Sequence, residues 1–184
     1  VVPAFDMYAA CSDAAGGRIV EVPLGEGFAF PLEQVRRAVT PRTRAVWLTD
    51  PHNPTGQVIP REAIAGIADA APRALVMVDE AYADFAGTSL IGSELLAAHP
   101  NVLVGRTFAK AHGLAGLRIG AVAGHPETLA PLRRVIPPYS INACVAAALP
   151  AALGDRAWFE WYLAQVAESK ALIYEELGRR GIPF

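Results

Sequence analysis

Three short apolar runs, separated by stretches with helical periodicity, constrain this chain more than any other feature. The runs cover residues 45–48, 74–78 and 102–104, and each is short enough to be a strand. Every side chain in them is apolar, which is typical of parallel strands that are buried on both faces of a sheet. Residues 61–71 lie between the first two runs and have apolar side chains at helical spacing. Strands that alternate with helices predict an α/β fold with a mainly parallel sheet.

Weaker patterns add further elements around these runs. We expect helices over residues 3–15, 32–39, 93–98, 126–135 and 143–153, a long last helix after Asp155, and short strands at 18–22 and 119–123. Asp155 suits the N-cap of the last helix, because its carboxylate can accept a hydrogen bond from a free backbone N–H group. Val1 and Val2 are typical of the end of a strand and residues 181–184 of the start of another. We therefore expect the chain to be part of a longer protein.

The composition excludes several classes of function. The 184 residues are 53% hydrophobic and 18% charged, and the net charge is -2 at pH 7. Nucleic acids and anionic membranes attract basic surfaces, so neither is expected as a partner. No apolar run is long enough to span a bilayer. The two cysteines, Cys11 and Cys144, have no metal-ligand spacing and predict a protein of the reducing cytoplasm.

Lys110 follows the third apolar run and is the first candidate for chemistry. Its flanks are apolar, which would keep its amine neutral and able to attack a carbonyl carbon. Gly113 and Gly116 allow the backbone to approach a ligand closely, and Arg118 can hold a phosphate with two parallel hydrogen bonds. A single lysine is more often an exposed surface charge. A lysine followed by a phosphate anchor nevertheless favours a site for pyridoxal phosphate (PLP).

Polar motifs also follow the other two apolar runs. Residues 50–56, Asp-Pro-His-Asn-Pro-Thr-Gly, predict a rigid loop at a carboxyl end of the sheet, where open α/β sheets bind ligands. Asp79 ends the second run and would need a partner such as a protonated ring nitrogen, unless it caps a helix. We expect Glu80 to be an exposed charge and His52 to be a neighbour of the site rather than a ligand.

The stretch from Arg106 to Arg118, Arg-Thr-Phe-Ala-Lys-Ala-His-Gly-Leu-Ala-Gly-Leu-Arg, resembles the lysine motif of the fold-type I PLP-dependent aminotransferases, and most of all that of the histidinol-phosphate aminotransferases. Two positions differ. Ala109 stands where the family has a serine that contacts the cofactor phosphate, and His112 where it has an aromatic residue. Further motifs of this family are matched, in order, at residues 3–8, 50–56, 79–82 and 137–142. The resemblance covers nearly all of the chain but about half of a family enzyme, and it implies a three-layer fold with helices on both faces of the sheet.

The resemblance assigns the reacting end of the cofactor to four residues. Lys110 would bind the cofactor covalently and then act as the catalytic acid and base. Asp79 would pair with the ring nitrogen. Asn53 and Tyr82 would donate hydrogen bonds to the ring oxygen O3′.

The rest of the cofactor is assigned in the same way. Phe5 would stack on the ring, and Thr107 and Arg118 would hold the phosphate. Tyr8 is expected only to pack within its helix.

The resemblance implies amino-group transfer from histidinol phosphate to 2-oxoglutarate, a reaction of histidine biosynthesis. Aromatic amino acid aminotransferases and threonine-phosphate decarboxylases are enzymatic alternatives. A PLP-binding sensor domain of a transcription regulator is a non-enzymatic one. The family also implies a small-molecule amino donor, a 2-oxo acid and a homodimer. It divides the chain into a PLP-binding large domain at 1–156 and, at 157–184, a connecting helix with the start of a small domain.

Overall fold

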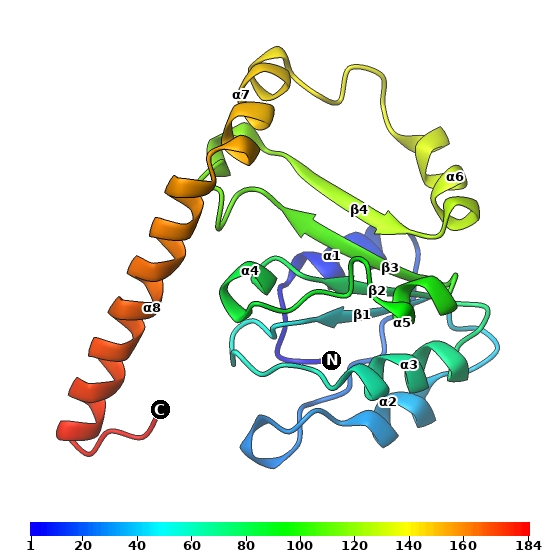
Figure 1. Cartoon of the computed structure of the whole chain (residues 1–184). Coiled ribbons are helices and arrows are strands. Elements are labelled where there is room, and N and C mark those ends of the chain that lie inside the picture. Colours follow the sequence, from blue (N-terminus) through cyan, green and yellow to red (C-terminus); the bar gives the residue numbers. More distant parts are fainter.

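The computed structural model describes residues 1–184 and contains one four-stranded sheet with helices packed around it (Figure 1). The strands are β1 (Ala45–Thr49), β2 (Leu75–Asp79), β3 (Val102–Thr107) and β4 (Gly120–Gly124), and they lie in this order in the sheet. β1, β2 and β3 are parallel, whereas β4 is antiparallel to β3. The predicted α/β fold with a mainly parallel sheet is therefore confirmed, with β4 as the one reversed strand.

The predicted helices are all present, and α4 (Ala83–Ala86) is an additional short one. The predicted helices are α1 (Met7–Ala14), α2 (Leu32–Ala38), α3 (Arg61–Ala70), α5 (Glu94–Ala98), α6 (Pro126–Val135), α7 (Ala143–Gly154) and α8 (Arg156–Arg179). Asp155 caps α8 as predicted, since its carboxylate accepts a hydrogen bond of 3.0 Å from the Trp158 backbone. No helix combines the length and the apolar character that crossing a membrane requires.

The strand predicted at residues 18–22 is wrong. Residues 18–21 are exposed and irregular, and the only pairing nearby is an isolated bridge between Val2 and Pro23. A strand needs a neighbour along its length to satisfy its backbone groups. In this chain only Val2 lies beside the segment, through bonds of 2.8 Å to Val22 and 2.9 Å from Leu24.

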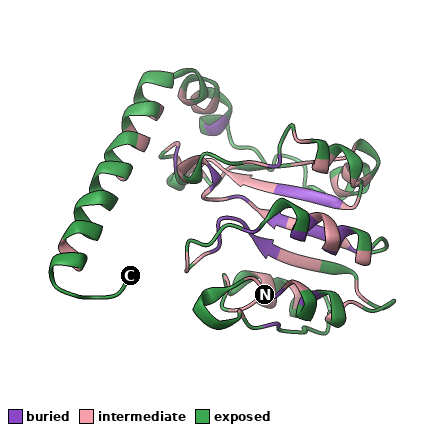
Figure 2. Cartoon of the chain, turned by 60° about the horizontal axis from the view of Figure 1, so that its bottom comes forward, coloured by how far each residue is buried: buried purple, intermediate pink, exposed green.

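The core lies on the face of the sheet that α2 and α3 cover. Alternate residues of a strand point to the same face, and here Val76, Val78, Val102 and Val104 are all fully buried. α3 presents Ile64, Ile67 and Ala68 to them, as its spacing predicted. In Figure 2 the buried residues accordingly concentrate in the strands and along one side of α3. This layer holds the parallel strands together.

α1 covers part of the opposite face, which completes the third layer. The Tyr8 ring stacks on the Trp47 indole of β1, with the two ring centres 5.2 Å apart. The Trp47 indole N–H donates to the Ser12 hydroxyl at 3.2 Å. The three-layer arrangement, with helices on both faces of the sheet, is thus confirmed.

α8 stands apart from the sheet and is exposed along almost its whole length (Figures 1 and 2). It touches the rest of the chain near its start, where Tyr162 packs on Phe85 of α4 and Phe159 on His112. The chain as a whole has 11683 Å² of accessible surface, compared with about 8,500 Å² for a compact monomer of its mass. Part of this excess is apolar, because Trp161, Leu172 and Ile173 of α8 are exposed.

We expect the contact between α3 and the sheet to dominate the stability of this core. Ile64 is 0% exposed, so Ile64→Ala should lower the free energy of unfolding by about 2–5 kcal/mol through lost burial and a cavity. Ile91→Ala removes the same atoms from a side chain that is 47% exposed and serves as the matched control. Urea denaturation measures both variants, and equal losses would contradict the central place of α3.

Candidate active site

The candidate site lies where the parallel strands end, on the face that α1 covers. Thr49 and Asp79 are paired across β1 and β2, and Asp79 is paired with Gly105 of β3. The alternation that buries Val76 and Val78 toward α3 turns Asp79 toward α1. Thr107, at the end of β3, shares this face for the same reason. Carboxyl ends of strands carry ligand sites in open α/β sheets, and the predicted residues follow that rule.

Asp79 is held by two hydrogen bonds from different elements. One carboxylate oxygen accepts from the Ala81 backbone N–H at 2.9 Å, and the other accepts from the Tyr8 hydroxyl of α1. Thr49 donates its hydroxyl to the Tyr8 oxygen at 3.4 Å. Burial, together with the bond to Asp79, raises the pKa of Tyr8 above its usual range. The side chain is therefore a neutral donor that orients the Asp79 carboxylate.

The interpretation of Tyr8 as a mere packing residue is wrong. Its ring does pack, on Trp47 and edge-on to Phe5 with centres 5.7 Å apart. Its hydroxyl, however, reaches across to β2. A signal for this was present in the spacing of Phe5 and Tyr8, which places both on one side of a helical turn. Phe5 itself is half exposed beside this cluster.

Lys110 and Tyr82 lie side by side. The lysine amine is 5.4 Å from the centre of the Tyr82 ring, a cation–π distance. Tyr82 follows Asp79 by three residues in the chain. The expectation that Lys110 is desolvated is wrong for this chain, in which the residue is exposed. Its apolar neighbours in sequence point elsewhere, and Ala111 alone among them is fully buried.

The loop after Lys110 is fixed by its glycine and by α8. Gly113 has a φ of +68°, which favours glycine, and a Cβ atom there would lie 3.1 Å from the Trp158 ring. The Thr107 hydroxyl accepts a hydrogen bond of 3.1 Å from the Ala109 backbone. Arg118 is exposed, has a φ of +54° and donates to the Ala115 carbonyl at 3.1 Å. The loop thus keeps a defined shape between β3 and β4.

Asn53 and Arg118 are not in contact with the Asp79 and Lys110 cluster. No hydrogen bond or ion pair joins either side chain to those residues, although both lie in loops at the same end of the sheet. Asn53 is half-buried in the rigid 50–56 loop. In that loop the Asp50 carboxylate accepts from the Ile59 backbone at 2.9 Å.

The residues present suit PLP. A carboxylate, an amine and a guanidinium match a ring nitrogen, an aldehyde and a phosphate in turn. The strands pack closely beside Asp79, because a Cβ atom at Gly105, its partner on β3, would lie 3.0 Å from the Met77 side chain. A Cβ atom at Gly120 would lie 2.6 Å from the Arg106 carbonyl oxygen, so that position admits no side chain.

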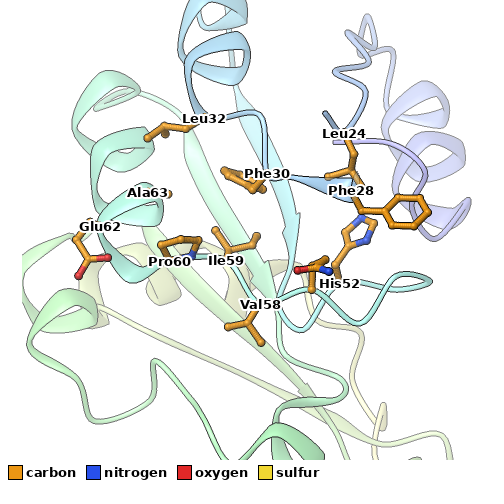
Figure 3. A pocket seen from close by; sticks show the side chains of 11 residues that line it. Leu24, Phe28, Phe30, Leu32, His52, Val58, Ile59, Pro60, Glu62 and Ala63 are labelled. Carbon is orange, nitrogen blue, oxygen red and sulfur yellow. The ribbon is translucent and has the colours of Figure 1, made fainter. Parts of the chain in front are cut away.

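His52 lies in a different part of the molecule from this cluster. It is one of the side chains around an apolar groove of about 400 Å³, formed by residues 24–32 and 52–63 (Figure 3). Its Nδ1 atom is 2.9 Å from the Thr55 hydroxyl, and burial lowers the pKa of the imidazole. None of the seven predicted site residues lines this groove. His52 is therefore a neutral side chain of this groove.

Comparison with known proteins gives a family match along nearly the whole chain. Residues 2–184 match the family described as aminotransferase class I and II. The chain is 37% identical to a histidinol-phosphate aminotransferase of Ralstonia nicotianae, over 95% of this chain and 46% of that protein. It is 41% identical to an aromatic amino acid aminotransferase of Mycobacterium ulcerans, over 78% of this chain and 40% of that protein.

The fold is shared with solved structures of the same kind. The histidinol-phosphate aminotransferase of Sinorhizobium meliloti, solved in complex with pyridoxal-5'-phosphate, superposes with a TM-score of 0.80 at 28% identity. The match covers 98% of this chain and 50% of that one. The chain thus spans about half the length of the relatives it matches.

The Tyr8 hydroxyl should stay protonated at the pH where exposed tyrosines ionise, near pH 10. Its pKa is raised in the folded state, so its bond to Asp79 stabilises the fold below about pH 10. That contribution is lost as the pH rises further, because the unfolded chain releases the proton first. In an ultraviolet absorbance titration we expect Tyr8→Phe to leave the number of tyrosines that ionise near pH 10 unchanged. A decrease of one in Tyr8→Phe would contradict the bond.

Proposed function

The chain belongs to the class I and II aminotransferase family, and from this premise we propose that the protein containing it is a PLP-dependent aminotransferase. The observation that carries the proposal is the placement of Asp79 and Lys110 at the ends of adjacent parallel strands. The carboxylate ends β2, the amine follows β3, and the Tyr82 ring lies 5.4 Å from the amine. No other feature of the chain supports a threonine-phosphate decarboxylase or the sensor domain of a transcription regulator instead.

Asp79 and Lys110 divide the chemical work. When bound, PLP supplies a ring that accepts electrons from the Cα atom of an amino acid. The Asp79 carboxylate would hold a proton on the ring nitrogen, which keeps the ring electron-accepting. The Lys110 amine would bind the cofactor's aldehyde carbon and, once displaced by the amino donor, take a proton from Cα and deliver it to the neighbouring cofactor carbon. Tyr8 would keep the carboxylate turned toward the ring.

The other predicted residues would hold the cofactor in place. Thr107 and Arg118 would contact the phosphate, and Ala109 contributes no hydroxyl there. Phe5 would cover one face of the ring beside Tyr8. Asn53 and Tyr82 would donate hydrogen bonds to the O3′ oxygen. Both residues follow the carboxyl ends of strands, where the cofactor would bind.

For the amino donor we propose histidinol phosphate, with 2-oxoglutarate as the acceptor, in histidine biosynthesis. The resemblance of the 106–118 motif to the histidinol-phosphate aminotransferases and the similarity to the Ralstonia nicotianae enzyme support this choice. The second candidate is an aromatic amino acid. It is favoured by the 41% identity to the Mycobacterium ulcerans enzyme, although over a shorter match.

We also propose that the whole protein is a cytoplasmic homodimer with two domains. Residues 1–156 would belong to the large domain and 157–184 to the helix that connects it to a small one. The position of α8, which starts at Arg156 and extends away from the sheet, supports that division. The exposed, unpaired cysteines, Cys11 and Cys144, are compatible with a reducing compartment.

Reduction with borohydride in the presence of PLP tests the covalent role of Lys110. We expect peptide mapping of the full-length protein to find the cofactor on Lys110, because the amine lies beside Tyr82 at the candidate site. Lys170, the other lysine of these residues, lies on the exposed α8. Lys110→Ala should abolish the label, whereas Lys170→Ala should keep it. A label on Lys170 alone would overturn the assignment.

The choice of amino donor is tested by kcat/KM of the full-length protein with 2-oxoglutarate as acceptor. We expect histidinol phosphate to exceed phenylalanine and tyrosine by at least about a hundredfold, because a site built for a charged group rejects substrates that leave its own groups unpaired. The opposite order would identify an aromatic amino acid aminotransferase. Bound PLP with no turnover of any amino donor would refute the proposed enzyme.

A further inference from the structure

Glu80 was predicted to be an exposed charge, and that prediction is wrong. The side chain is 1% exposed and accepts three hydrogen bonds. The Leu90 backbone and the Ser89 hydroxyl each donate at 2.6 Å, and an Arg106 guanidinium nitrogen donates at 3.1 Å. A buried carboxylate is stable only when its oxygens are satisfied in this way. Glu80 is therefore a structural residue of the protein interior.

Arg106 connects Glu80 to a second carboxylate. Its other terminal nitrogen donates to Asp84 of α4, and both ion pairs are largely shielded from water. The planar guanidinium suits such a double contact, because it offers donors in a fixed fork. We call Glu80, Arg106 and Asp84 the buried triad. It joins the end of β2, the end of β3 and α4.

The buried triad lies directly behind the candidate site. Glu80 follows Asp79, and Arg106 precedes Thr107. Because side chains alternate along a strand, the triad occupies the face of the sheet with Val78 and Val104, while Asp79 and Thr107 occupy the other. The Glu80 backbone N–H also donates to the Gly105 carbonyl at 2.8 Å. This last hydrogen bond between β2 and β3 is thus supported by the ion pair of Glu80 with Arg106, on the face of the sheet that carries Val78 and Val104.

We propose that Arg106, through Glu80, is a positioning residue that sets the distance between the Asp79 carboxylate and the Lys110 amine. The inference rests on the proposed function. Beyond Asp79 and Gly105 the strands β2 and β3 have no further pairs, so the two chain segments that carry the reacting groups could separate at this point. The Arg106 guanidinium holds the two segments together. One of its nitrogens donates to Glu80, the residue after Asp79. Arg106 itself lies on β3, the strand that leads into the Lys110 loop.

The triad acts on the site without touching the cofactor. Asp84 connects the buried triad to α4. Phe85, the next residue of α4, packs on Tyr162 of α8. His112, in the Lys110 loop, packs between Phe108 and Phe159. Burial lowers the pKa of this imidazole, so it adds no charge beside the triad. The guanidinium is therefore the cation that joins the two carboxylates.

Variants of Arg106 in the full-length protein test the proposal. We expect Arg106→Gln to weaken PLP binding by about tenfold or more, an effect like the loss of an outer-shell partner of a metal ligand. It should lower kcat more than it raises KM, and it should shift the pH at which the absorption band of the bound cofactor changes. Arg106→Lys keeps the charge but loses the fork and should fall between the parent and Arg106→Gln. Arg36→Gln, which removes an exposed pair with Glu33 on α2, is the control and should leave all three readings unchanged.

Each outcome bears on the proposal. Reduced thermal stability with unchanged PLP affinity and an unchanged absorption profile would show that the triad only stabilises the fold, which overturns it. If Arg106→Gln yields no folded protein, Arg106→Lys decides, and parental PLP affinity and absorption in that variant would also overturn it. A parent protein that fails to bind PLP would instead refute the proposed function. Normal binding by the parent and by both Arg106 variants refutes the positioning role alone.

Discussion

Along β2 and β3 every second side chain is buried against α2 and α3, and the side chains between them face α1. This alternation makes one pair of strands serve two purposes. Val76, Val78 and Glu80 point into the interior, whereas Asp79 points to the open face. A shift of the register by a single residue would exchange the faces. It would leave a carboxylate in the apolar core and turn valines toward the site, so the packing of valines against α3 also determines where the chemistry can occur.

Most of the fold could be predicted because its signals are local. The apolar runs of β1, β2 and β3 and the helical spacing of α3 each identify an element without reference to any other part of the chain. The segment at 18–22 shows the limit of this reasoning. Its valines and isoleucine have strand propensity, but a strand also needs a partner, and partners are a property of the tertiary structure.

The reacting groups of the candidate site could be predicted from the sequence better than the residues that position them. Asp79, Tyr82 and Lys110 were identified by their places after apolar runs, and the structure puts Lys110 beside Tyr82 and Asp79 at the end of the adjacent strand. Tyr8 and Glu80 were misjudged for a common reason. Each makes its decisive hydrogen bond with a residue far along the chain: Tyr8 with Asp79, and Glu80 with Arg106. Burial of a polar side chain is decided by such distant partners, and no spacing within a single element reveals them.

The reversal of β4 has a consequence for the way this chain folds. Because β3 and β4 are antiparallel neighbours, they form a hairpin whose long turn carries Lys110. Its turn covers only residues 108–119, whereas the two parallel pairings must close the longer connections at residues 50–74 and 80–101. Local contacts form faster than distant ones, since they lose less chain entropy. The lysine loop can therefore take its shape early, and the later docking of β2 beside β3 is the step that brings Asp79 to it.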